Sequence, residues 1–545
     1  CRPSDEPPPD EPRDSTPAVD TAPSTPPDDD PPPDDPPPAI TEVTLGVPVG
    51  CPDPGARAAL GPLAAPVTGG GWDRQTWDPA NRELFLGGGL LVADLDGDGR
   101  LDVLLPGEGG AQLLLQTAPG AWIDASDRLP ADPGVDAVAA VAADPDADGD
   151  LDVLVTRYRH PLSWWRNLGD GRFEDATVEV GLQDPMPDRR TTTATFADVD
   201  LDGDIDLFVA AFGPFYQHPR PPGDPSLLYL NDGDGRFVAA HDWLPPQVQD
   251  GYVFVASLVD LGRDPQPELY TVHDFGNTWP NVLSWGGSLQ PDDGAAGLNV
   301  AMQGMGLDLG DIDGDGTLDL VMAGWGSNEL MMGSASGAWF ERSRAAGLTP
   351  DPQRGQEIGW STLLADVDND LDLDVVEGFG RVFNQASPDL QPDEVWLQTT
   401  PGSFEPVGAA WGFDHPGQTR AVLAEDLDGD GWLDLIRRDL IGPTTLQLAR
   451  CGAEAWIEVT LDDPTSHNRA ALGARVTAIA GGVHVTRPMV AGSRGVLAGN
   501  PAAIHFGLGA HEQVDRLEIV WPDGGADALD DVPARRRITV RRGAR

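Results

Sequence analysis

Lysine is absent from the sequence, because all 35 basic residues are arginine. This excludes a P-loop, a Schiff-base enzyme and a Ser-x-x-Lys acyltransferase, since each of these needs a lysine side chain. His-Glu-x-x-His, Gly-x-Ser-x-Gly and a strand-linked Gly-x-Gly-x-x-Gly are also missing. No run of about 18 apolar residues occurs, so we expect no membrane-spanning helix.

Positive charge is scarce as well. The 545 residues carry 89 acidic side chains and a formal net charge of −54. This charge disfavours binding to nucleic acid and to anionic membrane surfaces, because both are negatively charged. Such a number of carboxylates favours the binding of hard cations through oxygen atoms. The 66 Gly and 53 Pro indicate many turns, and hence β structure in more than one domain or in a repeat.

The chain begins at Cys1, and residues 2–38 hold 15 Pro and 11 acidic residues against two Arg. Such a segment buries too little apolar surface to fold, so residues 1–38 are predicted to be a disordered, extended stalk. An N-terminal Cys before a tether resembles a processed bacterial lipoprotein, which would make Cys1 the lipidated residue. The alternative is an arbitrary boundary.

Two further cysteines, Cys51 and Cys451, lie just before the first copy and just after the last copy of a repeat described below. A disulfide between them would clasp the repeat region in an oxidising compartment. Two unpaired buried thiols are the alternative, because sequence alone does not set connectivity.

A nine-residue pattern, Asp-x-Asp-x-Asp-Gly-x-x-Asp, organises the chain. Copies start at residues 94, 144, 198, 311, 366 and 426, and a degraded copy starts at residue 260. An apolar stretch precedes each copy, a strand-like run follows it, and hairpin signals such as Asn-Asp-Gly-Asp-Gly come later in several units. Seven units of about 55 residues, each with about four strands, predict an all-β, seven-bladed propeller over residues 39–450.

Alternating carboxylates in a tight turn, with a backbone carbonyl at position 7, are the oxygen ligands that Ca²⁺ prefers. Without a cation the carboxylates would repel, so the metal is expected to be needed for folding. The alternative is a surface turn rich in Asp and Gly, and Mg²⁺ suits the loop less well. The predicted Ca²⁺ ligands of about five or six sites are Asp94, Asp96, Asp98, Arg100 and Asp102; Asp144, Asp146, Asp148, Asp150 and Asp152; Asp198, Asp200, Asp202, Asp204 and Asp206; Asp311, Asp313, Asp315, Thr317 and Asp319; Asp366, Asp368, Asp370, Asp372 and Asp374; and Asp426, Asp428, Asp430, Trp432 and Asp434.

Two copies depart from the pattern. Leu371 stands where the glycine of position 6 belongs, which predicts a strained turn. The copy at 260 has Gly262 at position 3 and Pro265 at position 6, so we expect no metal there.

The repeat spacing resembles the FG-GAP/VCBS repeats of integrin-α-like propellers. Residues 451–545 resemble an ASPIC/UnbV domain, through NRAALGARVTAI at 468–479, AIHFGLG at 503–509 and VDRLEIVWPDG at 514–524. The combination resembles the bacterial cartilage-acidic-protein-like family, and the resemblance covers essentially all of residues 80–545. It implies a Ca²⁺-binding propeller and identifies no ligand.

Residues 451–545 hold 11 acidic and 11 Arg residues, and their short alternating runs predict a small β-sandwich. The run Arg535-Arg536-Arg537 and the pair Arg541-Arg542 could bind an anionic partner. Docking on the acidic propeller, or a solvated face, is the preferred interpretation.

Evidence for an active site is weak. His273-Asp274 in the degraded unit is a candidate pair, although a turn residue in a hairpin is the simpler interpretation. Exposed aromatic residues could line a sugar or peptide groove, but most are expected in the core; the candidates are Trp164, Trp165, Trp279 and Trp325.

The sequence therefore predicts a non-catalytic, Ca²⁺-binding protein of the bacterial cell envelope for adhesion or ligand binding. It would be lipid-anchored to the outer membrane on the surface or periplasmic side, or secreted, with an unknown protein or glycan ligand and no nucleic acid. A secreted polysaccharide hydrolase or lyase and a structural or assembly module are the alternatives. Fold does not decide among them.

Overall fold

The structure is a computed structural model that describes residues 39–49 and 86–543, apart from residues 133, 215–220, 263–265, 287–288, 350–356, 382–390, 415, 441 and 450–451. The predicted stalk, the lipidation residue Cys1 and the pair Cys51 and Cys451 lie outside the described residues. Within the described part, no helix is long and apolar enough to cross a membrane.

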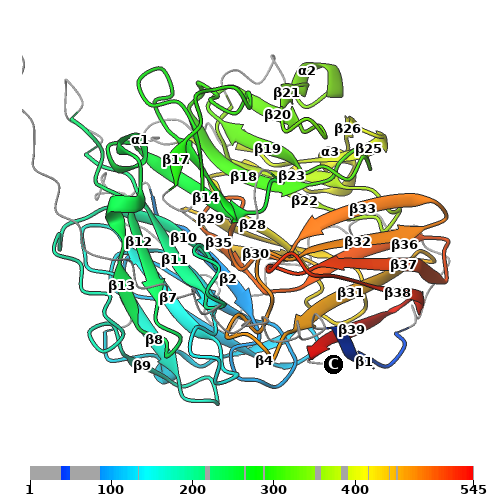
Figure 1. The fold of residues 1–545 in the computed structure, drawn as a ribbon, viewed down its shortest axis with the longest axis horizontal. Coiled ribbons are helices and arrows are strands. Elements are labelled where there is room, and N and C mark those ends of the chain that lie inside the picture. Colours follow the sequence, from blue (N-terminus) through cyan, green and yellow to red (C-terminus); the bar gives the residue numbers. More distant parts are fainter. Residues whose placement is uncertain are drawn as a thin grey trace, which may run out of the picture. The chain divides into compact units, whose positions relative to one another are not determined.

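Seven antiparallel groups of three or four strands follow one another along the described part of the chain, and each forms one blade (Figure 1). The first and third groups are joined through residues 492–500 into one ten-stranded sheet. Blades 1 to 4 consist of β2 (Leu90–Ala93), β3 (Asp102–Leu105), β4 (Gln112–Ala118) and β5 (Ala121–Asp124); β6 (Ala137–Ala143), β7 (Asp152–Arg157), β8 (Ser163–Asn167) and β9 (Phe173–Asp175); β10 (Thr191–Ala197), β11 (Asp206–Ala211), β12 (Leu227–Asn231) and β13 (Phe237–Ala239); and β14 (Val253–Val259), β15 (Glu268–His273), β16 (Val282–Trp285) and β17 (Gln290–Pro291).

Blades 5 to 7 follow the same plan. They consist of β18 (Gly304–Gly310), β19 (Asp319–Gly324), β20 (Asn328–Met332) and β21 (Phe340–Glu341); β22 (Gly359–Ala365), β23 (Asp374–Phe379), β25 (Glu394–Thr400) and β26 (Ser403–Pro406); and β28 (Thr419–Glu425), β29 (Asp434–Asp439) and β30 (Thr444–Gln447). Short elements connect the strands: β24 (Gln391–Pro392) paired with β27 (Pro416–Gly417), the helices α1 (Pro246–Gln249), α2 (Ser343–Ala346) and α3 (Gly408–Trp411), and the 3-10 turns η1 (Ser126–Arg128) and η2 (His241–Trp243).

The first strands of the blades form a closed ring, since each contacts the next and β28 contacts β2. These inner strands are buried along nearly their whole length, and small residues such as those of Ala-Val-Ala-Ala-Val-Ala-Ala in β6 let neighbouring blades approach closely. Side-chain hydrogen bonds also join blade 7 to blade 1: Gln116 Nε2 donates to the Leu427 carbonyl at 2.6 Å, and Arg438 Nη2 donates to the Pro106 carbonyl at 2.9 Å. The predicted seven-bladed propeller is confirmed.

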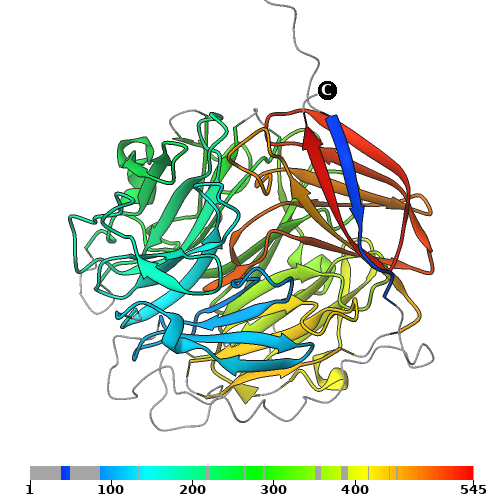
Figure 2. The same ribbon diagram turned by 90° about the horizontal axis from the view of Figure 1, so that it is seen from below.

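The C-terminal part is a sandwich of two four-stranded sheets. One sheet has the order β1 (Ala39–Leu45), β39 (Arg536–Gly543), β31 (Ala455–Asp462) and β36 (Ile504–Gly509), and the other has the order β33 (Val483–Pro488), β32 (Arg475–Ala480), β37 (Gln513–Val520) and β38 (Ala526–Pro533). The sequence analysis assigned residues 39–45 to the propeller, but this strand pairs antiparallel with β39, as Figure 2 shows for the blue and red strands. It covers the edge of β39, whose backbone groups would otherwise lack partners on that side.

One segment of the sandwich enters the propeller. We call residues 489–500 the plug; it contains β34 (Gly492–Arg494) and β35 (Ala498–Asn500). β35 pairs with β2 and contacts β6 and β28, whereas β34 pairs with β10 and contacts β14, β18 and β22. The plug therefore contacts the inner strands of all seven described blades.

The plug is packed as a core element. Val496 and Leu497 are fully buried and share one hydrophobic cluster with Phe254 and Trp360. Gly499 lies so close to blade 2 that a Cβ there would approach the Ala140 carbonyl oxygen to 2.5 Å, so no larger residue fits without a shift.

A buried ion pair joins blade 7 to the end of blade 6. Arg437 Nη1 lies 2.9 Å from Asp393 Oδ2, with side-chain exposures of 2% and 0%, and Asp393 also accepts hydrogen bonds from Thr419 Oγ1 and the Phe379 N–H. We expect Arg437→Met to lower the free energy of unfolding by about 3–5 kcal/mol, because it leaves a buried carboxylate without its cation.

Urea or thermal unfolding measures the effect. The matched control is Arg516→Met, because Arg516 pairs with Glu518 and Asp530 on an exposed surface, where water screens the pair and its loss should change stability far less. Equal free energies of unfolding for the two variants would contradict the stabilising role of the Arg437–Asp393 ion pair.

Candidate metal centres in the acidic loops

The acidic repeats join the first strand to the second strand of each blade. We number them loop 1 (94–102), loop 2 (144–152), loop 3 (198–206), loop 4 (260–268), loop 5 (311–319), loop 6 (366–374) and loop 7 (426–434). Each position keeps its role from loop to loop, so the repeat reflects one local structure.

The carboxylate at position 1 shapes the turn. In loop 1 the Asp98 N–H donates to Asp94 Oδ1 at 3.1 Å, and the Gly99 N–H donates to Asp94 Oδ2 at 2.8 Å. The same two bonds occur at Asp144, Asp198, Asp311, Asp366 and Asp426.

The carboxylate at position 9 connects the loop to its blade. Asp102 Oδ2 accepts the Leu95 N–H at 2.9 Å, and Asp102 Oδ1 accepts the Gln116 N–H of the third strand at 2.8 Å. Corresponding third-strand bonds reach Asp152, Asp206, Asp319, Asp374 and Asp434. The sequence analysis assigned position 9 to the metal alone and missed this second role.

Positions 4 and 6 both have left-handed backbone. At position 6, Gly99 has φ +84° and Leu371 has φ +78°, so the predicted conflict at Leu371 is confirmed: a leucine occupies the conformation that glycine adopts elsewhere. At position 4, Leu201 has φ +63° and Asn369 has φ +57°. The sequence analysis missed this second requirement, although Gly or Asn at position 4 of four loops hinted at it.

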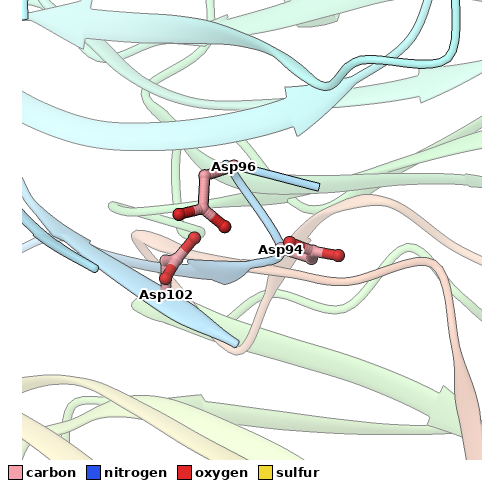
Figure 3. Close-up of side chains that lie close together, drawn as sticks. All are labelled: Asp94, Asp96 and Asp102. Atoms are coloured by element: carbon pink, nitrogen blue, oxygen red, sulfur yellow. The ribbon is translucent and has the colours of Figure 1, made fainter. Parts of the chain in front are cut away.

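Carboxylate oxygens from separate positions converge in these loops. Atoms within 4.8 Å of one another come from positions 1, 3 and 9 in loops 1, 3 and 6, and from positions 1, 3 and 5 in loops 2 and 5. Figure 3 shows Asp96 and Asp102 turning their carboxylates toward each other, with Asp94 beside them. The groups are Asp94, Asp96 and Asp102; Asp144, Asp146 and Asp148; Asp198, Asp200 and Asp206; Asp311, Asp313 and Asp315; and Asp366, Asp368 and Asp374.

These donors suit a hard divalent cation. Three carboxylate oxygen atoms of the loops are buried and have no hydrogen-bond partner: Asp96 Oδ1 and Asp200 Oδ1 at position 3, and Asp372 Oδ1 at position 7. Buried carboxylate oxygens without partners are costly unless a cation binds them. Several of the loops can therefore bind metal ions. The other members of the predicted ligand sets stay predictions, including the position-7 carbonyls of Arg100, Asp150, Asp204, Thr317, Asp372 and Trp432.

Burial raises the pKa of these carboxyl groups in the metal-free protein. Removal from water raises the pKa of Asp102 and Asp144 to about 7 and that of Asp152, Asp206 and Asp319 to about 8, and the neighbouring aspartates add repulsion. Near neutral pH, protons therefore occupy part of these carboxyl groups in the metal-free protein, at the positions where a cation could bind.

The described residues of loop 4 keep one contact of the other loops and lack part of their acidic set. Glu268 at position 9 still accepts the Leu261 N–H, at 2.6 Å. Gly262 supplies no carboxylate at position 3, and Arg475 of the sandwich approaches Asp260 at 3.5 Å. Pro265 lies outside the described residues. The prediction of an empty loop 4 stays a prediction, and the nearby guanidinium is in keeping with it.

The sandwich contacts loops 3 to 7. His467 Nδ1 lies 2.8 Å from Asp204 Oδ1, the Asp311 N–H donates to the Thr486 carbonyl at 3.0 Å, and His505 Nε2 lies 2.7 Å from Asn369 Oδ1. Arg537 Nη2 lies 3.1 Å from Asp426 Oδ2 in loop 7. Of the predicted basic cluster, Arg537 docks on the acidic propeller, whereas Arg541 and Arg542 pair within the sandwich, with Asp462 and with Asp463 and Asp523.

The remaining candidates are mainly structural. His273 is fully buried at the end of β15, and burial lowers its pKa to about 3, so it suits packing rather than proton transfer at neutral pH. Trp164 and Trp165 are fully buried. Trp279 is partly buried against Tyr252, and Trp325 is 37% exposed.

Family models match both parts of the chain. FG-GAP-like repeats match residues 94–155, 144–209 and 311–377, and a model named ASPIC and UnbV matches residues 464–545. The chain combines FG-GAP-like repeats with an ASPIC/UnbV domain. Cartilage acidic protein 1 is a homologue: the mouse protein is 26% identical over 490 residues, covering 80% of this chain and 70% of its own length, and the human protein is 24% identical over 487 residues, covering 80% and 69%.

Solved structures show a more distant likeness to this FG-GAP and ASPIC/UnbV protein. A lectin of Agrocybe aegerita, solved for its recognition of non-reducing terminal N-acetylglucosamine, is 16% identical with a TM-score of 0.39 and covers 64% of this chain and 88% of its own.

The pH dependence of stability should change sign with metal. A raised pKa in the folded state means that the metal-free FG-GAP loops contribute most stability below about pH 4 and lose it as the pH rises through about 6 to 8. In EDTA we therefore expect a lower melting temperature at about pH 8 than at about pH 5.5. With saturating Ca²⁺ the order should reverse, because metal binding displaces those protons. Calorimetric melts measure both, and a metal-free melting temperature that rises with pH would contradict the assignment.

Proposed function

We propose that the protein is a non-catalytic binding module whose FG-GAP propeller is stabilised by Ca²⁺ in its acidic loops. The observation that carries this is the recurrence of an oxygen cluster in loops 1, 2, 3, 5 and 6, always with the carboxylates of positions 1 and 3 and with position 9 or position 5 as the third member. The loops are built from oxygen donors in a flexible turn, which suits Ca²⁺ better than the strict octahedron of Mg²⁺.

The ligand surface would lie away from the sandwich. Loops 3 to 7 contact the ASPIC/UnbV domain, which leaves loops 1 and 2 and the opposite ends of the blades for a partner. Trp325, which follows the second strand of blade 5 and is 37% exposed, supplies an aromatic surface there. A protein or glycan ligand at the cell envelope fits such a face. Attachment through Cys1 stays a prediction.

A calcium titration tests the proposal. We expect calorimetry to count about five or six ions, and melting in Ca²⁺ to occur well above melting in EDTA, since each site at 100 times its Kd adds about 2.7 kcal/mol. Mg²⁺ at the same concentration should raise the melting temperature less. No heat of binding together with an unchanged melt would mean that the loops are turns alone.

A matched pair of variants locates the sites. Asp96→Asn should remove one ion from the count, because it removes the position-3 donor of loop 1. Asp530→Asn removes the same charge from an exposed ion pair on the sandwich and should leave the count unchanged. An equal count for the two variants would contradict the site.

A cleft supports a second candidate, a polysaccharide hydrolase or lyase. A space of about 590 Å³ lies between loop 3, the turn at Asp232-Gly233 and the sandwich, and it gathers Asp204, His467 and Arg542. Carboxylates beside an imidazole can exchange protons with a substrate. Incubation with acidic and neutral polysaccharides tests this, and activity that is lost in His467→Ala, with the fold intact, would favour the enzyme over the binding module.

A further inference from the structure

The sandwich contacts the loops unequally. Loops 3, 5, 6 and 7 are each bonded to the sandwich through residues within the acidic repeat, and loop 4 is paired with Arg475. Among the described residues, no hydrogen bond or ion pair joins loop 1 or loop 2 to the sandwich. The loops therefore fall into a set that is bonded to the sandwich, which we call covered, and a set that is not, which we call uncovered. Loop 2 of the uncovered set still shares a cavity of about 380 Å³ with Asp462 and Arg469 of the sandwich.

The covered contacts depend on the shape that the acidic turn adopts. Asn369 at position 4 of loop 6 accepts from the Gly509 N–H at 2.7 Å and donates through Nδ2 to the Gly431 carbonyl of loop 7 at 3.2 Å. In loop 7 the Trp456 ring packs directly on Gly431, which leaves no room for a Cβ at that position. A loop that opens under carboxylate repulsion would lose these contacts.

Loops of both sets begin a few residues after the seat of the plug, since Leu91, which pairs with Gly499, also lies three residues before loop 1. Only the direct contacts with the sandwich distinguish the covered loops. Thr195, which pairs with Gly492, lies three residues before loop 3, and Leu307, which bridges Gly495, lies four residues before loop 5. Arg494 of the plug is held by Asp308 Oδ2 at 2.9 Å, and Asp308 lies three residues before loop 5. A change in a loop therefore reaches the plug through a single short strand.

The plug is held in part by polar contacts around a small cavity. An enclosed space of about 40 Å³, enough for a few water molecules, is lined by Arg487, Arg494 and Asn500. Arg487 Nε, on a side chain that is 7% exposed, and Asn500 Oδ1 have no hydrogen-bond partner.

From these contacts we infer that the sandwich and its plug stay docked only while the covered loops hold divalent cations. This inference rests on the proposed Ca²⁺ binding and assigns different roles to the two sets of loops. The uncovered loops stabilise their own blades, whereas the covered loops also keep the propeller channel closed. Removal of the cation would withdraw residues 489–500 from the inner strands.

Loops 1 and 7 provide a matched test, because DLDGDGRLD and DLDGDGWLD differ only at position 7. The variants are Asp96→Asn in loop 1 and Asp428→Asn in loop 7, each in the full chain. Calorimetry counts the bound Ca²⁺, and hydrogen exchange is followed in the plug and in the outer strands of blade 2 (β8 and β9), which the plug does not cover. With Ca²⁺ present, we expect exchange in the plug to be about tenfold faster in Asp428→Asn, which corresponds to ~1.4 kcal/mol of lost docking free energy.

The remaining outcomes are distinct. Asp96→Asn should lose one ion and keep the wild-type exchange of the plug, and blade 2 should stay protected in Asp428→Asn, which excludes global unfolding. If Asp428→Asn keeps the full ion count, if it loses an ion without faster exchange of the plug, or if both variants accelerate that exchange equally, the coupling is wrong while Ca²⁺ binding stands. If the wild-type chain binds no Ca²⁺, both proposals are wrong.

Discussion

Each blade depends on a carboxylate that is withdrawn from water and held by backbone N–H groups. The position-1 aspartate sets the turn, and the position-9 aspartate ties the turn to the third strand of its blade. The same geometry brings further carboxylates within a few ångströms of one another, so the interaction that shapes the loop also creates a charge that must be neutralised. Protons or a cation can do this, and an arginine from the neighbouring domain does so in part at Asp426.

The propeller and the sandwich pack together as one compact unit. A ring of blades needs a closure, and here blades 7 and 1 meet through Gln116, Arg438 and the plug. The plug fills the axis where the inner strands converge, with Val496 and Leu497 in the same apolar cluster as residues of the surrounding blades. Neither part has a complete core without the other, because the apolar wall of the channel and the apolar face of the plug cover each other.

The repeats allowed the blade count, the all-β class and the position of the acidic loops to be predicted from sequence, because position, spacing and composition recur in each unit. The left-handed backbone at Leu371 was predicted from the glycine at the same position in other copies. The pairing of β1 with β39 and the course of residues 489–500 could not be predicted, since each is a single event without a repeat to mark it. The contacts between the sandwich and the loops also could not be predicted, because they depend on single residues of one domain that meet single residues of the other. Examples are His505 with Asn369 and Trp456 with Gly431.

The pairing of the first described strand with the last has a consequence for biosynthesis. Thr41 and Arg541, which are joined by a hydrogen bond, are 500 residues apart, and the plug is also made near the end of the chain. A ribosome therefore releases nearly the whole acidic propeller before its axis can be filled or its first strand can find a partner. Contacts so distant along the chain form slowly, so the growing polypeptide remains open for most of its synthesis.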